Sequence, residues 1–219
     1  MIKIELIDMM GNDLTVVNAA RVSYSKTKKS FELSDEKLIK YLAEHNHWSP
    51  FAHASLQFRI KAPIFVARQL GKHQVGLCWN EISRRYVNYD PEFWSAPEGF
   101  RGASRDKKQG SLNKVSPFNS EASAMMNTVH RDCLRIYREM LDMDICEEQA
   151  RAVLPQSMMT EWFWSGSLFA FSRVCNLRNS HDSQQETRNI SLQIDEICGR
   201  LYPVSWKALM NRNFEIGEG

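Results

Sequence analysis

The feature that most constrains the fold is a nearly continuous apolar stretch at residues 158–177, MMTEWFWSGSLFAFSRVCNL. We interpret this stretch as one helix that is apolar almost all the way round, and such a helix is normally buried. Two positions satisfy this requirement, the centre of a single chain and the interface of an oligomer. The chain has 219 residues, 43% of them hydrophobic and 25% charged, which is enough to enclose the stretch in a globular core.

Hydrophobic periodicity and helix-boundary residues predict the other elements. Alternation predicts strands at 2–8 and 54–62, the second with Leu56, Phe58 and Ile60 on its buried face. Helices are predicted at 14–23 after an Asp13 cap, 36–45 after Ser34 or Asp35, 64–74 after Pro63, 120–143, 147–154 after a capping box from Asp144 to Glu147, and 183–200. The expected buried face of 120–143 carries Val129, Cys133, Ile136, Tyr137, Met140 and Leu141. We find no repeat and no linker, and predict one domain over residues 1–219.

Charge and cysteine content narrow the class of protein. Lys plus Arg is 28 and Asp plus Glu is 26, a balance of +2 that argues against a general nucleic-acid binder. The five cysteines include no CxxC pair, which is typical of reduced thiols and predicts a cytoplasmic location. The first ten residues contain charges and do not resemble a signal peptide, and no window approaches the ~20 apolar residues of a membrane span.

Residues 87–119 are predicted to be irregular, because 95–120 is rich in Gly, Pro and Ser. This segment carries the basic residues Arg101, Arg105, Lys107, Lys108 and Lys114. It is either a solvated surface loop or a mobile lid over an acidic ligand. A purely structural or nucleic-acid-binding protein that uses the basic loop at 101–114 is an alternative of a different class.

The polar stretch 72–86, KHQVGLCWNEISRRY, is the strongest candidate site. If NEISRRY is helical, Glu81 and Arg85 lie one turn apart, either as an exposed ion pair or as part of a ligand site. Arginine suits phosphate, whereas glutamate and serine suit the polar edge of a neutral ring, so the mixture fits a nucleotide. Arg151, Arg173 and Arg178 strengthen the case for an anionic ligand. P-loop, GxGxxG and GxSxG motifs are absent, and we predict no metal site at His45, His47 and His53.

The residues Asn80-Glu81-Ile82-Ser83-Arg84-Arg85-Tyr86 resemble the NExSxRY half of the signature of flavin-dependent thymidylate synthases (the ThyX family), RHR followed after seven residues by Ser. Further blocks at 10–24, 49–58, 61–69, 150–156 and 163–178 resemble that family in the same order. The resemblance implies an α+β fold with a twisted antiparallel sheet packed with helices. It also implies reductive methylation of dUMP to dTMP, with 5,10-methylenetetrahydrofolate as carbon donor and FAD recharged by NADPH as hydride source, in a homotetramer.

The resemblance also implies a role for individual residues. The positions that match nucleotide-binding residues are Gln69, Glu81, Ile82, Ser83, Arg84, Arg85, Arg151 and Arg178, with Ile82 and Arg84 acting through the backbone and Arg178 also catalytic. Those that match positions near the flavin or the folate are Ser23, His53, Ser55, Lys72, His73, Gln74, Ser167, Arg173 and Asp182.

Three departures from the family pattern motivate a second hypothesis. RHR is replaced by Lys72-His73-Gln74, eight residues instead of seven precede Ser83, and Asp182 stands where the family often has histidine. Lysine does not replace arginine at a bidentate site. The alternative is therefore a degenerate member that binds dUMP or flavin without turnover. Cys78 lies in the motif, but the family reaction needs no enzyme thiolate, so we interpret it as structural.

Overall fold

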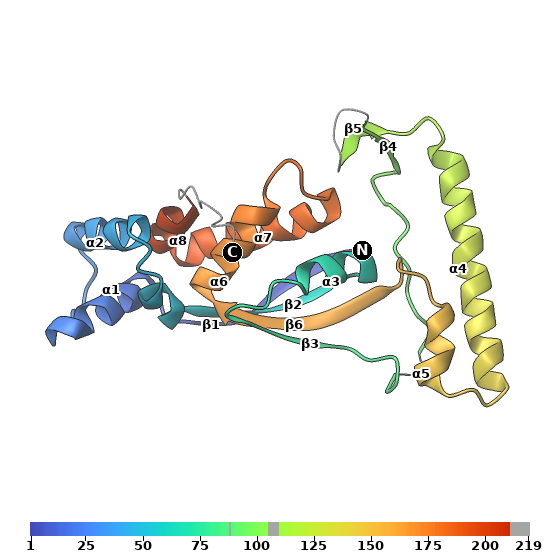
Figure 1. Cartoon of the computed structure of the whole chain (residues 1–219), viewed down its shortest axis with the longest axis horizontal. Helices are drawn as coiled ribbons and strands as arrows, with labels where there is room; N and C mark the ends of the chain where they lie inside the picture. Colours follow the sequence, from blue (N-terminus) through green and yellow to red (C-terminus); the bar gives the residue numbers. More distant parts are fainter. Residues whose placement is uncertain (88, 105–109, 211–219) are drawn as a thin grey trace. The chain divides into compact units, whose positions relative to one another are not determined.

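The structure is a computed structural model that describes residues 1–87, 89–104 and 110–210 (Figure 1). Its strands are β1 (Lys3–Met10), β2 (Ser55–Pro63), β3 (Leu77–Glu81), β4 (Arg101–Ala103), β5 (Ser111–Val115) and β6 (Met159–Ser167). Its α-helices are α1 (Asp13–Arg21), α2 (Leu33–Glu44), α3 (Ile64–Leu70), α4 (Asn119–Asp142), α5 (Glu147–Ala150), α6 (Leu168–Arg178), α7 (Gln185–Leu201) and α8 (Pro203–Met210). The 3₁₀ helices are η1 (Val22–Tyr24), η2 (Ser49–His53) and η3 (Arg151–Val153). Within these ranges no helix has the length and hydrophobicity needed to cross a membrane.

Four strands form one sheet in the order β1-β2-β6-β3, and β4 and β5 form a separate antiparallel pair in which Arg101 lies opposite Val115. The predicted fold class, helices packed with an antiparallel sheet, is confirmed. The predicted strand at 54–62 is also confirmed, since Leu56, Phe58 and Ile60 are fully or almost fully buried.

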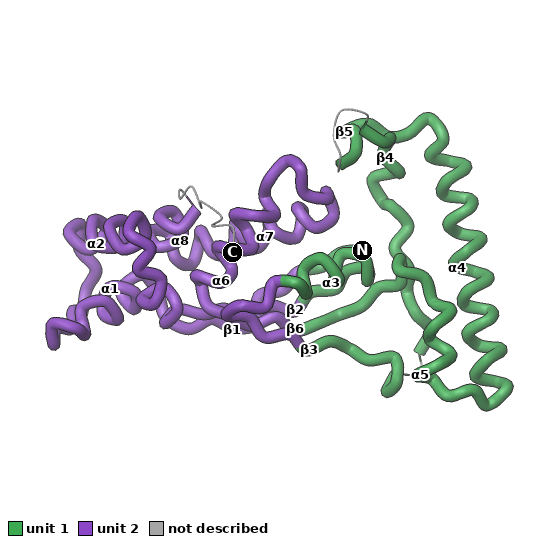
Figure 2. Tube along the Cα trace, viewed as in Figure 1, with its two compact units in different colours: residues 1–3, 60–72, 80–162 green, residues 4–59, 73–79, 163–219 purple. Residues whose placement is uncertain are grey.

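The chain divides into two compact units, each assembled from separate segments (Figure 2). Unit 1 contains residues 1–3, 60–72 and 80–162, and unit 2 contains residues 4–59, 73–79 and 163 onward. The single domain over residues 1–219 stays a prediction.

Unit 2 is organised around α6. This helix packs against α7, α8 and η2, and its Phe171 ring meets Phe58 and Trp164 at centroid distances of 5.0 and 5.3 Å. The N-terminus of α8 is capped by Asp13, whose carboxylate accepts from the backbone N–H groups of Val204 and Ser205 at 3.0 and 2.8 Å. Helix α8 was not predicted from the sequence. Because aromatic side chains are buried around α6, this helix forms the core of unit 2.

Unit 1 contains α4, which packs against α5 and η3. The predicted apolar face of this helix is only partly correct. Tyr137 is buried as expected, but Val129 and Ile136 are 45% and 37% exposed, and the buried polar position is His130. The His130 ring stacks on Phe93 at 4.6 Å, and its Nε2 lies 2.8 Å from the Ser157 hydroxyl. A buried hydrogen bond therefore replaces part of the expected apolar contact.

The prediction of one helix over 158–177 is wrong. Residues Met159–Ser167 form β6, and the helix begins only at Leu168. Period-two alternation is present in this strand, since Thr160, Trp162 and Trp164 are buried while Phe163 is 41% exposed. Because the exposed positions are also occupied by large or neutral residues, the sequence conceals the alternation.

The helix hypothesis for NEISRRY is also wrong. Strand β3 ends at Glu81, and residues 84–86 form a turn in which Tyr86 N–H donates to the Ser83 carbonyl at 3.0 Å. Segment 87–119 is less irregular than predicted, because it contains β4, β5 and a bridge between Phe93 and Met158. Of the basic residues of that segment, Arg105, Lys107 and Lys108 lie outside the described residues.

Several helix boundaries differ from the predictions. The N-cap of α1 is Asn12, whose side chain accepts from Thr15 N–H, so Asp13 is the first helical residue. Helix α2 is capped by Glu32, with Asp35 as its reciprocal partner. The predicted 147–154 helix ends early at Ala150 and continues as η3, and its N-cap is Cys146 rather than Asp144. In the first two cases the cap lies one to three residues before the predicted position, because several adjacent residues have capping side chains.

Candidate active site

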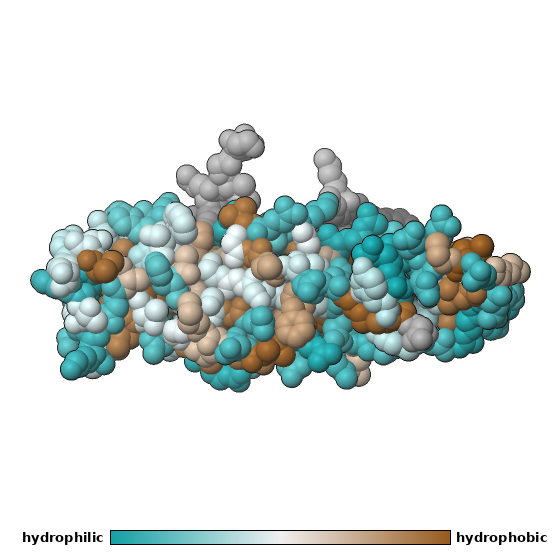
Figure 3. Space-filling model, turned by 90° about the horizontal axis from the view of Figure 1, so that it is seen from below, coloured by the Kyte–Doolittle hydropathy of each residue, from teal (hydrophilic) through white to brown (hydrophobic). Residues whose placement is uncertain are grey.

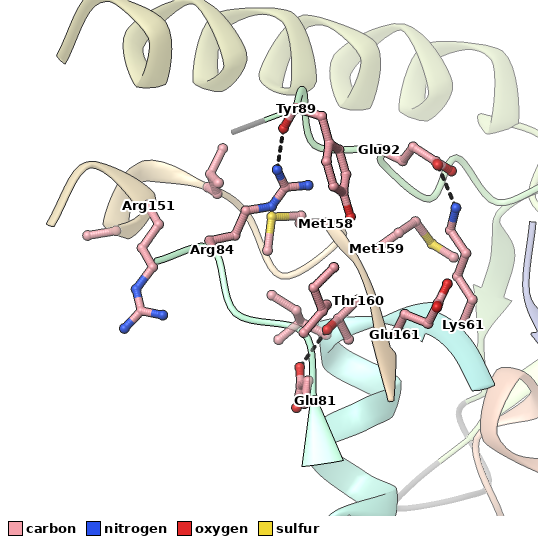
Figure 4. A pocket seen from close by; sticks show the side chains of 14 residues that line it. Lys61, Glu81, Arg84, Tyr89, Glu92, Arg151, Met158, Met159, Thr160 and Glu161 are labelled. Carbon is pink, nitrogen blue, oxygen red and sulfur yellow. Dashed lines mark hydrogen bonds and ion pairs between the residues drawn. The ribbon is translucent and has the colours of Figure 1, made fainter. Parts of the chain in front are cut away.

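Unit 1 contains a cavity of about 340 Å³ at the end of β3 (Figure 4). Six charged side chains line it, and they are Lys61, Glu81, Arg84, Glu92, Arg151 and Glu161. Equal numbers of cations and carboxylates suit a ligand that carries both an anionic group and neutral polar groups. Of the predicted nucleotide-binding residues, Glu81, Ile82, Arg84 and Arg151 meet in this cavity.

Glu81 is placed by strand pairing. The Ile82 N–H donates to the Glu161 carbonyl at 2.9 Å, so the chain stays paired with β6 just beyond the end of β3. The Thr160 hydroxyl donates to Oε1 of Glu81 at 2.6 Å, as the dashed line in Figure 4 shows. The carboxylate is therefore held at the cavity wall by a neighbouring strand.

Arg84 has a different environment from its neighbour Arg85. The Arg84 side chain is 8% exposed, donates to the carbonyl oxygen of Tyr89, and lies 4.7 Å over the Tyr89 ring. Arg85 is exposed and contacts the Ser83 hydroxyl at 3.4 Å. The guanidinium of Arg84 thus holds the chain that follows the strand, whereas Arg85 projects from the turn.

The other predicted nucleotide residues lie on three elements. Arg151 is exposed on η3, where its Nε donates to the Glu148 carbonyl at 3.2 Å, and it lines the cavity. Gln69 is partly buried on α3. Arg178, the predicted catalytic residue, ends α6 and belongs to unit 2.

Unit 2 contains a second cluster, in which Arg178 Nε donates to Nε2 of His73 at 3.0 Å. Burial, aided by the positive charges of Arg178 and Arg173, lowers the pKa of His73 to about 4. Burial also lowers the pKa of Arg178, which still leaves it charged near neutral pH. His73 is therefore neutral at pH 7, with Nε2 as acceptor and the ring proton on Nδ1.

The start of α6 brings further predicted flavin residues together. Ser167 is its N-cap, with a side chain that accepts from Ala170 N–H at 3.1 Å and an N–H that donates to the Gly76 carbonyl at 3.3 Å. The N–H of Leu168 donates to the Ala54 carbonyl at 2.8 Å, next to Ser55. Segment 73–77 and the start of β2 are thus both attached to this helix terminus.

The remaining predicted flavin residues are exposed. They are Ser23 in η1, His53 in η2, Lys72 and Gln74 on either side of His73, Arg173 on α6, and Asp182, which pairs with His181 at 3.1 Å. Within the described ranges no group of three or more His, Cys, Asp or Glu side chains is arranged to hold a metal ion.

Five polar cavity residues were missed in the sequence, namely Thr160, Lys61, Glu92, Tyr89 and Glu161. Lys61 and Glu92 form an ion pair of 2.5 Å across 31 positions of sequence. Thr160 had only a weak signal, because it is one of four hydroxyl residues in the apolar stretch 158–177. The others had none, because their proximity depends on how distant segments pack.

Comparison with known proteins supports a single family. A model of the family described as "Thymidylate synthase complementing protein" matches residues 5–204. A flavin-dependent thymidylate synthase of Kosmotoga olearia is 38% identical over 209 residues, which cover 95% of this chain and 90% of that protein. One of Thermus thermophilus is 38% identical over 205 residues, covering 94% and 74%.

A solved structure gives the same result for the fold. The crystal structure of a UMP/dUMP methylase PolB from Streptomyces cacaoi bound with 5-Br UMP is similar to this chain, with a TM-score of 0.83 and 28% identity over 95% of this chain and 93% of the other. The same methylase bound with 5-Br dUMP has a TM-score of 0.81.

Proposed function

Because this chain belongs to the family of flavin-dependent thymidylate synthases, we propose that it methylates dUMP reductively to dTMP. The observation that carries the proposal is the cavity at the end of β3, where Glu81, Arg84 and Arg151 meet. The nucleotide-binding set is Gln69, Glu81, Ile82, Ser83, Arg84, Arg85, Arg151 and Arg178.

Within this set the residues divide by chemistry. Arg85 and Arg151 are exposed guanidinium groups that neutralise the phosphate of the nucleotide. Glu81 accepts a hydrogen bond from a donor group of the sugar or base. Arg84 acts differently, since its guanidinium contacts Tyr89, and it offers the nucleotide its backbone.

The cluster in unit 2 fits a flavin dinucleotide. Arg173 and Arg178 both act electrostatically on His73, so two guanidinium groups lie close to one neutral ring, and this donor set suits a pyrophosphate and a polar ring edge. Lys72, His73, Gln74, Ser167, Ser23, His53, Ser55 and Asp182 complete the proposed flavin and folate positions. Reduced FAD supplies the hydride when bound, and NADPH and methylenetetrahydrofolate supply its electrons and the carbon.

Arg178 has the catalytic role in this proposal. Its guanidinium stabilises negative charge that develops on the carbonyl oxygens of uracil. His73 accepts a hydrogen bond from the Nε of Arg178, and this contact orients the guanidinium. Because His73 is neutral, it adds no opposing positive charge beside the arginine.

The proposed working form is a cytoplasmic homotetramer in which each chain acts as one domain. Support comes from the exposure of Arg85 and Arg151 on the single chain. The attraction between a cation and a phosphate is stronger when a second surface excludes water from the pair.

Two measurements test the function. The first is the absorbance of the purified protein with FAD, then with NADPH under nitrogen, with and without dUMP. The second is tritium release from dUMP labelled at C5 in the presence of methylenetetrahydrofolate, with UMP as a second substrate and Arg178→Ala as the inactive control.

We expect a flavin spectrum that NADPH bleaches, and tritium release that falls at least about 100-fold in Arg178→Ala. Bound flavin without tritium release would establish the binding-only alternative motivated by Lys72 and Gln74. Full turnover in Arg178→Ala would remove this arginine from the mechanism.

A further inference from the structure

We propose that Thr160 is a positioning residue for the nucleotide, acting through Glu81, whose carboxylate its hydroxyl orients toward the cavity. The inference rests on the proposed function and adds to it a residue outside the signature motif. It concerns one hydrogen bond within unit 1 and both of its partners line the same cavity.

The geometry identifies a strong hydrogen bond. The Thr160 side chain is 4% exposed, and its hydroxyl lies 2.6 Å from Oε1 of Glu81. A hydroxyl that donates to an ionised carboxylate typically gives an O···O distance of about 2.5–2.7 Å, so this contact is of the charge-assisted kind. It joins two residues 79 positions apart in the sequence.

The two strands make this contact possible. Thr160 lies at the second position of β6, and Glu81 is the last residue of β3, which is an edge strand of the sheet. The Ile82 N–H donates to the Glu161 carbonyl at 2.9 Å, so the backbone just beyond Glu81 is still paired with β6, the strand that carries Thr160. Figure 4 shows the Thr160 hydroxyl directed at the Glu81 carboxylate.

The chemistry explains why a hydroxyl matters here. A glutamate side chain at a strand end has several rotamers, and binding a ligand in one of them costs conformational entropy. A charge-assisted hydrogen bond restricts that choice before the ligand arrives. Valine would fill the same buried strand position and keep the β-branched shape, so packing alone does not require the hydroxyl.

The test uses Thr160→Val, which removes the hydroxyl, and Thr160→Ser, which keeps it. Calorimetric titration of the FAD-loaded protein with dUMP gives Kd, and steady-state tritium release gives kcat and KM. We expect Thr160→Val to raise Kd and KM for dUMP about ten-fold, with kcat within about two-fold of wild type and FAD affinity unchanged. Thr160→Ser is expected to restore most of the lost affinity.

Ser165→Ala is the matched control. Ser165 lies on the same strand, and its hydroxyl accepts from Gln57 Nε2 at 2.9 Å. Removing this hydroxyl also breaks one side-chain hydrogen bond of β6, but not one that reaches Glu81. We expect Ser165→Ala to leave Kd for dUMP unchanged. An equal loss of dUMP affinity in Ser165→Ala and Thr160→Val would mean that β6 acts only structurally, and would overturn the inference.

The remaining outcomes separate this inference from the proposed function. If wild type binds dUMP and Thr160→Val binds it equally well, Thr160 has no positioning role while the function stands. If Thr160→Val loses kcat and FAD binding together with a lower Tm, the side chain is structural. If wild type itself does not bind dUMP, both the proposed function and the inference are wrong.

Discussion

At the residue scale, neighbouring arginines of one motif have different environments. Arg84 is buried and contacts the carbonyl and ring of Tyr89, whereas Arg85 is exposed in the turn. The sequence RRY does not distinguish them, because both side chains have the same chemistry. The turn after β3 directs one inward and the other outward. The chemistry of the side chain therefore limits what either arginine can bind, and the direction of the backbone in the turn determines which of the two is exposed.

Cys78 provides a prediction at this scale. It is exposed on β3 within the motif, but the proposed reaction requires no enzyme thiolate. We expect Cys78→Ala to keep tritium release within a few-fold of wild type, and to keep its Tm, because an exposed side chain contributes little to stability. A folded Cys78→Ala protein that binds dUMP and FAD but releases no tritium would require a thiolate mechanism instead.

His73 gives the protein a pH-dependent stability. Its pKa is near 6.5 in an unfolded chain and about 4 in the fold, because burial and the charges of Arg178 and Arg173 disfavour protonation. Well above pH 6.5 the residue is neutral in both states. As pH falls from there toward about 4, the unfolded chain binds a proton that the folded chain does not, so the free energy of unfolding decreases.

We expect His73→Gln, which retains an acceptor for Arg178, to lack this component. Urea unfolding of both proteins at about pH 7.5 and about pH 5 measures it. His130, whose pKa burial also lowers, contributes in the same direction but equally in both proteins, so it cancels in the comparison. If the two proteins lose the same stability on acidification, His73 is protonated freely in the fold.

At the element scale, the junction between β6 and α6 supports much of unit 2. Ser167 caps the helix, and the backbone there bonds to Gly76 and Ala54. The sequence of 158–177 is apolar throughout because the strand and the helix are both largely buried. Hydrophobicity therefore identified the segment as part of the core. It did not reveal where the period changes from two residues in the strand to 3.6 residues in the helix.

The substitution Gly166→Ala tests how closely β6 approaches the segment at the start of β3. A Cβ at this position would lie 2.4 Å from Leu77 Cδ2 and 2.6 Å from the Gly76 carbonyl oxygen. Because a backbone carbonyl cannot rotate away as a side chain can, Gly166→Ala is expected to destabilise the protein by about 1–3 kcal/mol. It should also weaken FAD binding, since displacement of Gly76 moves His73 and Gln74.

Gly199→Ala is the control for that substitution. Its Cβ would meet Trp206 Cδ1 at 3.4 Å, an ordinary contact, and it lies within α7. Alanine there should leave the Tm equal or higher, because it improves helix propensity. Thermal unfolding and FAD titration of the two variants make the comparison. A Gly166→Ala protein as stable as wild type, with normal FAD affinity, would contradict the close approach.

At the scale of the whole molecule, large apolar side chains are exposed on a single chain, and Figure 3 shows hydrophobic residues on one of its faces. Val22, Tyr24 and Tyr86 are 70%, 76% and 78% exposed, and they adjoin the proposed ligands Ser23 and Arg85. Exposed apolar surface next to a binding site is typical of an interface.

We therefore expect light scattering after gel filtration to give four times the chain mass of 25.4 kDa. Turnover per chain should decrease on dilution in parallel with dissociation, because the proposed site needs a covering surface. A monomer with full turnover per chain would show that one chain completes the site.

The sequence by itself determined the family, the strand at 54–62 and the positions of most helices. It could do so because these depend on local patterns, such as the alternation of Leu56, Phe58 and Ile60 or the order of residues in NEISRRY. Only the tertiary structure decided that NEISRRY leaves a strand rather than forming a helix, and that the apolar stretch divides at Leu168.

The same distinction applies to the candidate site. Glu81 and Arg178 are proposed from motif positions, but their hydrogen-bond partners Thr160 and His73 lie 79 and 105 positions away in the chain. Such contacts leave no local pattern, because they depend on which strands pair and which helix end meets which loop. The physical reason is that side-chain chemistry is a property of each residue, whereas proximity is a property of the packed chain.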